Sequence, residues 1–337
     1  MTLTLLTSRI NDPLPGLAGA REYVLGASSI GLLSADHSAG WPVQSIAAPL
    51  LGCADDSLQE IWRLECECRC GVFEGISFRR AGPLLYGVIE LDELAFGSAQ
   101  SPLQAATEEA YRRIFRLLEQ EGLPHLWRVW NYLADINVES DGLERYRQFN
   151  IGRQDAFIAF KRGATGNMPA ACAIGLAGGP LSIAFMAGEQ PATPVENPRQ
   201  VSAYNYPVDY GPRSPTFSRA NLVYLPAQEI LFISGTASIV GHLTVHPGDA
   251  AGQCLESLAN IAAVVQEASA LSRGAAYRLE ALSYRVYIRH AGDFEGIRQL
   301  LAERLGAAEI VYLQADICRA DLLVEIEASA LQSLGNS

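Results

Sequence analysis

Near its C-terminal end the chain runs Leu323-Val324-Glu325-Ile326-Glu327-Ala328, in which apolar and acidic residues alternate. A period of two is typical of a β-strand, and it places Glu325 and Glu327 on one face and the apolar residues on the other. If the predicted sheet is covered on both sides, at least one of these carboxyl groups is partly removed from water. Burial raises the proton affinity of a carboxyl group, which a general acid working near neutral pH requires. The alternative is a solvated face with two ordinary carboxylates.

Outward from this strand, the C-terminal part of the chain predicts a regular order of elements. A second short strand is expected before the polar turn Arg319-Ala320-Asp321, so that residues 309 onward form a strand pair. The elements expected ahead of this pair are a hairpin at 222–239, a long helix at 248–271, a strand at 279–289 and a helix at 294–305.

The N-terminal part predicts the same order. The expected elements are strands within 61–71, 72–78 and 84–91, a helix at 101–122 capped by Ser101, a strand at 126–137, a helix from 143 and a strand pair at 170–187. Residues 1 to about 35 suggest an edge hairpin or a packed arm. The repeated order predicts an internal duplication and an α+β fold.

Residues 190–215 separate the two copies. This segment is too rich in proline for a regular element, yet it also carries Tyr204, Tyr206, Tyr210 and Arg213. An irregular segment of this length is more often functional than a plain linker. We therefore predict an N-terminal domain with its arm at 1–190 and a C-terminal domain at 191–337.

Composition limits the classes of function. The 337 residues are 49% hydrophobic and carry a net charge of −12, which argues against a nucleic-acid surface. No apolar run reaches the roughly 18–20 residues needed to cross a membrane, and no signal peptide is evident at the start. Seven cysteines fit reduced thiols better than a disulfide framework. We expect a soluble, cytoplasmic protein.

Two motifs could suggest a metal site, and neither has the right geometry. Cys66, Cys68 and Cys70 would lie in a line along one strand, where we expect them to pack as buried thiols. His242 and His246 fall in a predicted loop or strand end, where residues four apart do not converge as they do on a helix. We expect no metal and no cofactor.

Several segments resemble known families. The C-terminal copy resembles the YjgF/RidA fold through Pro215-Thr216-Phe217-Ser218-Arg219, Ile233-Ser234-Gly235-Thr236 and the 324–328 strand. Across the whole chain the sequence is similar to the chorismatases. That resemblance rests on Arg128-Val129-Trp130-Asn131-Tyr132, residues 145–153, Tyr204-Asn205-Tyr206-Pro207, Gly211-Pro212-Arg213-Ser214-Pro215 and Ser234-Gly235-Thr236-Ala237. It implies two tandem RidA/YjgF-like (chorismate-mutase-like) domains, each a mixed sheet with helices on one face.

The resemblance also implies a reaction and its residues. Chorismatases cleave the enolpyruvyl ether of chorismate and release pyruvate, and Glu325 matches the glutamate that protonates the enolpyruvyl group. Cys318 matches members that make 3-hydroxybenzoate, with 4-hydroxybenzoate left open as an additional product. The substrate-binding candidates are Arg153, Tyr204, Tyr206, Arg213, Arg219 and Ala237, with Arg289 as a weaker one. Arginines suit the two carboxylates of chorismate through bidentate hydrogen bonds.

Two other functions stay open at this stage. The first is a RidA-like imine deaminase, although the arginine by which those enzymes hold a substrate carboxylate is missing from residues 310–312. The second is a non-catalytic protein of the RidA type that binds a small ligand. A monomer and a homotrimer are both compatible with the sequence.

Overall fold

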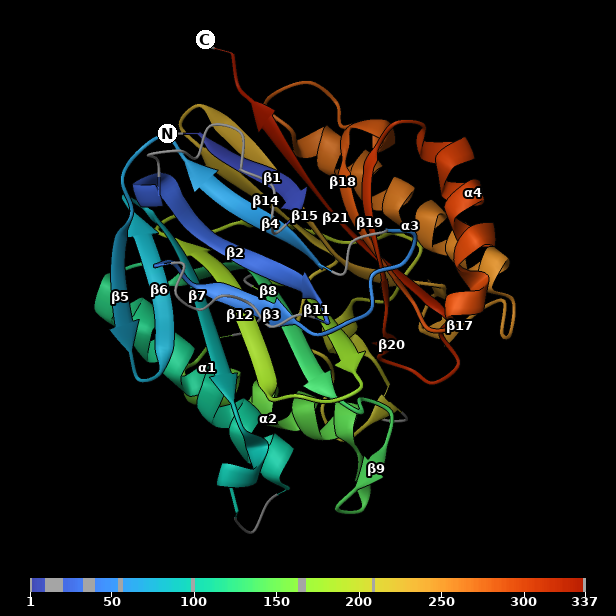
Figure 1. Ribbon diagram of the computed structural model, residues 1–337, viewed down its shortest axis with the longest axis horizontal. Helices are drawn as coiled ribbons and strands as arrows, with labels where there is room; N and C mark the ends of the chain where they lie inside the picture. Colours follow the sequence, from blue (N-terminus) through green and yellow to red (C-terminus); the bar gives the residue numbers. More distant parts are fainter. Residues whose placement is uncertain are drawn as a thin grey trace.

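The computed structural model describes residues 2–9, 21–32, 40–53, 57–97, 101–162, 168–207 and 210–335. Within them the main strands form sheets of four, seven and six strands, and two short two-stranded sheets complete the set (Figure 1). The short sheets are β9 (Glu139–Ser140) with β10 (Leu143–Glu144), and β16 (Ile239–Val240) with β17 (Leu243–Thr244). The fold is α+β, as the sequence predicts.

The seven-stranded sheet has the order β20-β11-β8-β12-β7-β6-β5. Its strands are β5 (Arg69–Phe73), β6 (Ile76–Ala81), β7 (Leu84–Leu91), β8 (His125–Ala134), β11 (Ala170–Leu176), β12 (Leu181–Gly188) and β20 (Asp316–Ile317). Helices α1 (Pro102–Glu121) and α2 (Arg145–Ala159) cover one face with a continuous apolar core. As expected, the Ser101 hydroxyl caps α1, and Gly122 ends it in the left-handed conformation at φ 65°.

The six-stranded sheet has the order β13-β14-β15-β21-β18-β19. Its strands are β13 (Thr193–Val195), β14 (Ala220–Leu225), β15 (Gln228–Ala237), β18 (Ser283–Ile288), β19 (Glu309–Gln314) and β21 (Val324–Ser333). Helices α3 (Ala250–Leu271) and α4 (Phe294–Leu305) cover its outer face. The run β14-β15-β21-β18-β19 repeats β6-β7-β12-β8-β11, with parallel pairing of the last two strands in both sheets. The predicted duplication is therefore present in the topology, while the domain boundary at residue 190 stays a prediction.

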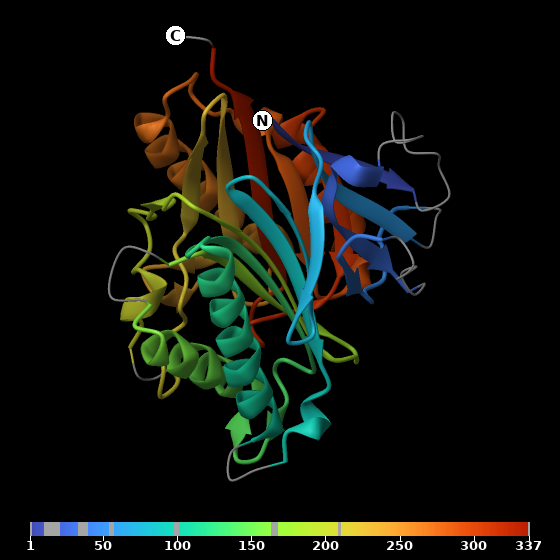
Figure 2. The same cartoon turned by 90° about the vertical axis from the view of Figure 1, so that its left-hand side faces the viewer.

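The N-terminal strands form a third wall. Strands β1 (Leu3–Arg9), β4 (Ser57–Leu64), β2 (Val24–Gly31) and β3 (Val43–Ile46) make the four-stranded sheet in this order. It lies on the side of the seven-stranded sheet opposite to α1 and α2 (Figure 2). One apolar core joins all three sheets, with Trp62, Trp130 and Phe232 in contact from one sheet each.

Three sequence expectations need correction. The strand expected across 61–71 is wrong, because β4 ends at Leu64 and the chain turns before β5 starts in another sheet. The N-terminal arm is no hairpin, since β4 lies between β1 and β2; residues 10–20 and 33–39 lie outside the described residues. The final strands β19 and β21 are not partners either, because β18 lies between them.

The connection between β19 and β21 crosses from one half of the chain to the other. Its short strand β20 leaves the six-stranded sheet and pairs with β11, so that Ile317 lies opposite Ile174. The loop that follows, residues 318–321, is thereby held where the two halves meet.

Candidate active site

A cavity of about 360 Å³ opens where the two halves of the chain meet. Its walls come from α2, from β15 and β21, from the loop after β20 and from the segment before β14. A smaller pocket of about 30 Å³ shares Tyr146, Phe217, Gly235, Cys318 and Glu325 with the cavity and adds Arg153. We describe the two as one site with an outer and an inner part.

Glu325 lies in the wall between the two parts and is only 3% exposed. The sheet makes room for it at Gly235, where a β-bulge shifts the register between Ile233 and Thr236. A Cβ atom added at Gly235 would lie 1.9 Å from Glu325 Oε1. Glycine is therefore the residue that lets the carboxyl group lie against the backbone of β15.

Glu325 and Glu327 share a face of β21, as predicted, but their surroundings differ. Glu327 contacts Arg128 at 2.5 Å and Arg285 at 3.2 Å. Among the described residues no group donates a hydrogen bond to the Glu325 carboxyl. Burial, followed by the charge of Glu327, raises the pKa of Glu325 to about 8, against a smaller lowering by Arg128. Glu325 is therefore a protonated acid at neutral pH, and the solvated alternative is wrong.

Cys318 lines the same pocket as Glu325 and lies near its carboxyl group. It is the first residue after β20, and the pairing of β20 with β11 fixes its position. Burial is the largest cause, and the nearby Glu325 the next, of a rise in the pKa of Cys318 to about 12. The side chain is therefore a neutral thiol rather than a thiolate nucleophile.

Three arginines that line the site each have a guanidinium nitrogen without a hydrogen-bond partner. The Nε atoms of Arg153 and Arg219 and the Nη2 atom of Arg319 are buried without a hydrogen-bond partner. Their hydrogen bonds go to neutral groups: Arg153 donates to Asn150 Oδ1, Arg219 to the Tyr206 hydroxyl, and Arg319 to the His242 carbonyl. Arg219 also lies near the carboxyl group of Glu196, whose pKa it lowers against a larger rise from burial. Buried guanidinium groups facing a cavity favour an anionic ligand, carboxylates in particular.

Aromatic rings complete the outer part. Arg319 lies 4.0 Å from the ring centroid of Tyr210 and 5.4 Å from that of Tyr206. Arg219 lies over Tyr206 and Phe217. These contacts hold the guanidinium groups in place and give the cavity apolar walls suited to a flat ring.

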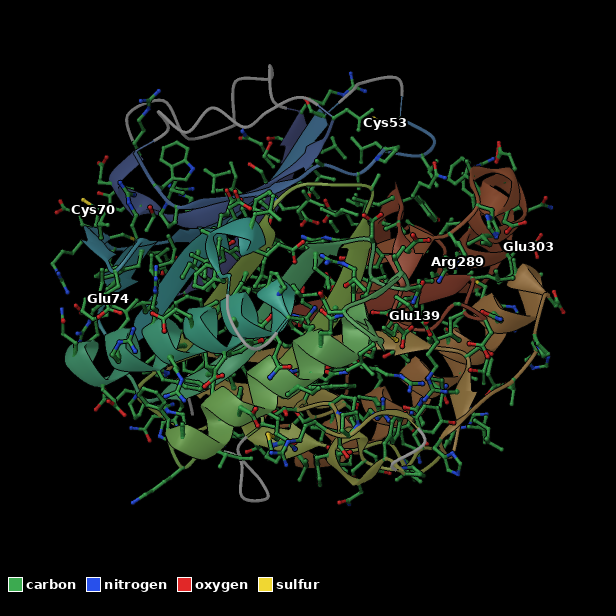
Figure 3. The ribbon with its side chains drawn as sticks, turned by 90° about the horizontal axis from the view of Figure 1, so that it is seen from below. Cys53, Cys70, Glu74, Glu139, Arg289 and Glu303 are labelled. Carbon is green, nitrogen blue, oxygen red and sulfur yellow. The ribbon has the colours of Figure 1, made fainter. Side chains whose placement is uncertain are left out.

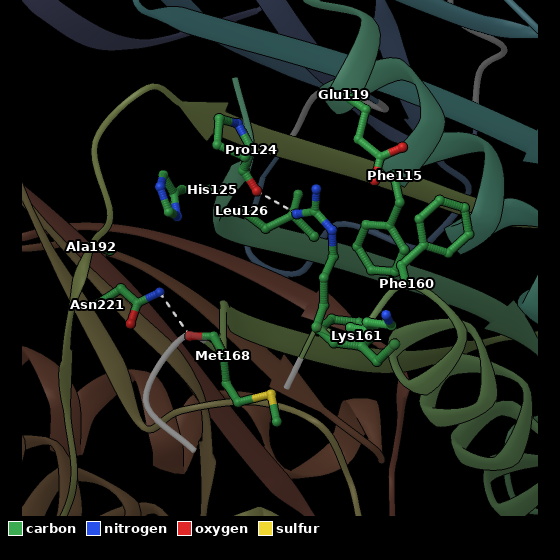
Figure 4. Close-up of a pocket in the computed structure, with 12 residues that line it drawn as sticks. Phe115, Glu119, Pro124, His125, Leu126, Phe160, Lys161, Met168, Ala192 and Asn221 are labelled. Carbon is green, nitrogen blue, oxygen red and sulfur yellow. Dashed lines mark hydrogen bonds between the residues drawn. The ribbon is translucent and has the colours of Figure 1, made fainter. Parts of the chain in front are cut away.

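A second cavity, of about 300 Å³, lies between the ends of α1 and α2 and the start of β8. In Figure 4 Asn221 bonds the carbonyl of Met168 at one side, and Phe115 and Phe160 form the other. Arg162 donates to the Pro124 carbonyl there. We assign no function to this cavity, because Arg162 and Met168 in its lining are the described residues on either side of a segment outside the described part of the chain.

In the described part of the chain, no group of three or more His, Cys, Asp or Glu side chains is placed so that it could hold a metal ion. The expectation of three buried thiols is wrong: Cys66 and Cys68 lie in the turn between β4 and β5 and are partly buried, and Cys70 is exposed. His246 lies 3.6 Å from Glu256, and His242 accepts or donates a bond with the Tyr210 hydroxyl at 3.2 Å. No helix in the described residues is long and apolar enough to cross a membrane.

Comparison with known proteins gives the family. A family model described as chorismatase FkbO/Hyg5-like, N-terminal, matches residues 60–187. A chorismatase from Streptomyces rapamycinicus is 42% identical over 283 residues, which cover 81% of this chain and 82% of that protein. The chain belongs to the chorismatase family.

Two further chorismatase-family relatives agree. A 3-hydroxybenzoate synthase from Streptomyces hygroscopicus is 38% identical over 284 residues, which cover 80% of each chain. A crystal structure of a chorismatase matches with a TM-score of 0.86 at 33% identity, covering 97% of this chain and 98% of that one. The fold expected from the resemblance to the chorismatase family is confirmed.

Of the residues singled out from that chorismatase resemblance, most meet in the site. Glu325, Cys318, Arg219, Tyr206 and Ala237 line the outer part, and Arg153 lines the inner part. Tyr204 does not line it, because it packs against the core beneath α1 and α2. Arg213 is directed to Asp155 at 3.2 Å, with 44% of its side chain exposed.

Arg289, the weaker candidate, has a structural position. Figure 3 labels it among the C-terminal strands, where it bonds Asp316 and the carbonyls of Ile317 and Arg319. Its guanidinium group thus fixes the loop that carries Cys318 rather than lining the cavity.

Sequence reasoning missed several residues of the site, namely Glu144, Tyr146, Arg147, Tyr210, Gly235 and Arg319. Tyr146, Arg147 and Gly235 stand inside segments already quoted for the resemblance, which was the available signal. Arg319 follows Cys318 directly, but a polar turn gave no reason to place its side chain inside.

Proposed function

We propose that this protein cleaves the enolpyruvyl ether of chorismate, releasing pyruvate and 3-hydroxybenzoate. The observation that carries the proposal is Glu325, buried in the wall of a cavity where burial raises its pKa, beside arginines that each have a buried guanidinium nitrogen without a hydrogen-bond partner, in a chain of the chorismatase family. A curated relative that is 38% identical over 80% of the chain is named 3-hydroxybenzoate synthase, which supports this product.

The chemistry follows from the substrate. An enol ether becomes labile when its methylene carbon is protonated, because the ether oxygen then stabilises the cation that forms. The Glu325 carboxylic acid donates this proton and becomes a carboxylate beside the developing positive charge. The bond between the ether oxygen and the ring then breaks, which releases pyruvate and leaves a ring cation. The ring loses one proton as it becomes aromatic, and this proton restores the acid form of Glu325, so the overall conversion to a hydroxybenzoate consumes no water.

The cations orient the substrate. Arg219 and Arg319 stand at the outer part and Arg153 at the inner part, so each carboxylate of chorismate meets a guanidinium group at one end of the site. Tyr206, Tyr210 and Phe217 enclose the ring between them. Cys318, a neutral thiol next to Glu325, contacts the ring fragment and directs it toward the hydroxybenzoate.

No observation favours the two alternatives. An imine deaminase of the RidA type would need an arginine near Ile310–Tyr312, and β19 provides none. A passive binding protein would not need an acid held protonated at neutral pH. We further propose that the chain acts as a monomer without a cofactor; the cytoplasmic location stays a prediction.

The test is incubation of the purified protein with chorismate, without added metal or cofactor. Products are resolved by liquid chromatography while pyruvate is assayed. Pyruvate and 3-hydroxybenzoate in equal amounts support the proposal, and any 4-hydroxybenzoate is separated in the same run. Pyruvate release no faster than the spontaneous decay of chorismate would overturn it.

A further inference from the structure

Next to Glu325 along β21, four charged side chains that do not line the cavity form a buried chain of ion pairs. Arg128 bonds Glu327 at 2.5 Å, Arg285 lies 3.2 Å from the other oxygen of Glu327, and Arg285 also bonds Glu60. Their side chains are 2% to 9% exposed. The members come from β8, β21, β18 and β4, so all three large sheets contribute.

The charges in this chain balance. Arg128 and Arg285 carry two positive charges, and Glu327 and Glu60 carry two negative ones. Glu325 lies two residues from Glu327 on the same face of β21, and Arg128 is the cation that reaches both. Because Glu327 already occupies Arg128, no counter-ion in this network is left for an ionised Glu325.

Other groups also face Glu325. From α2 come Tyr146 and Arg153, from β11 comes Cys172, and from the turn before β21 come Cys318 and Arg319. The tyrosine and the two thiols are neutral, since burial raises the pKa of each.

The remaining neighbours lie further out or are also neutral. Tyr287 of β18 stands opposite Glu325, and its hydroxyl bonds that of Tyr132 at 2.7 Å. Arg219 and Glu144 line the outer cavity. A bound dianionic substrate would neutralise the arginines that line the cavity. In the complex with substrate, the charge state of Glu325 is therefore set by the neighbouring ion-pair network.

We propose that Glu327 is a positioning residue for the reaction, which keeps Glu325 in its acid form by occupying Arg128 and by adding a fixed negative charge beside it. This inference rests on the proposed role of Glu325 as the proton donor. The pKa of Glu325, raised first by burial and next by Glu327 and lowered by Arg128, has the direction that this arrangement requires.

The test compares the pH dependence of kcat/KM in single and double variants. Glu327→Gln leaves the network with a net positive charge next to Glu325, so the alkaline limb of the profile shifts to lower pH, by about one unit or more. Arg128→Gln has the opposite effect on the charge and shifts the limb to higher pH. The double variant restores the balance and returns the limb toward its wild-type position.

Glu60→Gln is the matched control at the far end of the network. It also leaves one positive charge in excess, but farther from Glu325, so the shift has the same direction and is smaller. Glu327→Gln leaves Arg128 without its acidic partner, and an unpaired buried charge is strongly destabilising. In Glu60→Gln, by contrast, Arg285 keeps Glu327 as a partner, so this variant keeps the test decisive if Glu327→Gln fails to fold. Variants that lower kcat/KM equally at every pH, with the limb unmoved, would overturn the proposal and leave these residues a structural role.

A second measurement needs no turnover. The infrared difference between the wild type and Glu325→Gln isolates the carboxylic-acid C=O band of Glu325. This band is followed as pH rises, and the titration is repeated in the Glu327→Gln background. A titration that moves to lower pH in Glu327→Gln supports the tuning even if chorismate proves not to be the substrate. An unmoved titration contradicts it, whatever the substrate.

Discussion

At the scale of single residues, the chemistry of this site depends on where the Glu325 carboxyl lies. It is 3% exposed, and ionising it would place a negative charge in an apolar wall next to the charge of Glu327. Glu327, two residues along the same strand, contacts two guanidinium groups instead. Two like side chains thus take different charge states because their neighbours differ, as in other enzymes that use a pair of carboxyl groups.

Burial of Glu325 implies a cost in stability that depends on pH. The pKa of its carboxyl is raised from 4.5 to about 8 in the folded protein, so between these values the folded state holds a proton that the unfolded state has released. The free energy of unfolding therefore falls as pH rises from about 4.5 to about 8, by a total on the order of a few kcal/mol.

Glu325→Gln removes this dependence, because the amide does not ionise. We predict that the variant matches the wild type in thermal stability below about pH 4.5 and exceeds it increasingly up to about pH 8. Thermal unfolding followed by circular dichroism across this range measures the difference. A constant difference at all pH values would show that Glu325 ionises alike in both states.

Cys318 carries a second prediction at this scale. In Cys318→Ala the cavity keeps its acid and its arginines, so pyruvate is still released at a rate within about tenfold of the wild type. The ring fragment, no longer directed by the thiol, is diverted toward the dihydroxycyclohexadiene carboxylate. Chromatography of the products measures the ratio; an unchanged ratio would mean that Cys318 only packs.

Strand alternation placed Glu325 and Glu327 on one face of a strand because this period is encoded locally. The pattern did not distinguish the two carboxyl groups, and Glu325 was singled out by the resemblance to the chorismatases. The patterns did not locate Arg319, since the position of its loop depends on the pairing of β20 with β11, far away in the chain. They did not locate Tyr146 either, because the cavity that it lines is formed with residues of the C-terminal half.

Tyr204 and Arg213 were expected in the site because they lie in segments that resemble the chorismatases. Tyr204 packs against the core instead, and Arg213 forms an ion pair with Asp155 on α2.

At the scale of elements, the bulge in β15 is the feature that accommodates the acid. Ser234 in this bulge accepts a hydrogen bond from the Ala171 amide and donates to the Ser218 carbonyl, which holds β15 against the N-terminal half. Gly235 follows it and lies against Glu325. The bulge therefore sets both the contact between the halves and the position of the carboxyl group.

Gly235→Ala tests this element. The added methyl group would lie 1.9 Å from Glu325 Oε1 and 3.2 Å from Cys172 Cβ, so the carboxyl must move away. We predict that kcat falls by roughly a hundredfold in a protein that still folds, as expected for a catalytic group displaced by about 1 Å. Gly178→Ala is the control, because no atom lies within 4 Å of a Cβ built there, and it should keep wild-type kcat. Equal activity in both variants would contradict the account of the bulge.

The sequence predicted the positions of helices better than the pairing of strands. Helix α1 lies where Ser101 and apolar spacing placed it, and α3 and α4 lie where apolar spacing alone placed them, because these signals act within a few residues. Strand β4 was joined to β5 since the apolar alternation continues past Leu64, yet the two strands belong to different sheets. Sheet partners are chosen by contacts distant in the sequence, which no local pattern contains.

At the scale of the whole molecule, three sheets enclose one apolar core within a single chain. The four-stranded N-terminal sheet covers the faces that the two duplicated halves leave away from their helices. The Gln228 side chain of β15 ties β1 to the C-terminal half, since it accepts a hydrogen bond from the amide of Leu3 and donates one to its carbonyl. The sequence indicated that each half had a second face to cover, but not that the N-terminal strands would cover it.

This closure argues against the homotrimer. In the described part of the chain one apolar core joins the inner faces of the three sheets, so we predict a monomer of 36.4 kDa across the concentration range used for assays. Size-exclusion chromatography with light scattering measures the mass. A stable mass of three chains would show that an outer surface, rather than the sheet faces, drives association.

The most direct test of the central claim follows the proton to its destination. The wild type and Glu325→Gln are incubated with chorismate in D2O, and the pyruvate formed is reduced at once to lactate so that its methyl group cannot exchange. If an exchangeable acid protonates the methylene carbon, mass spectrometry finds one deuterium in the methyl group, and folded Glu325→Gln forms almost no product. A methyl group without deuterium would mean that the hydrogen comes from the substrate itself, and full activity in Glu325→Gln would remove Glu325 as the donor; either result contradicts the account.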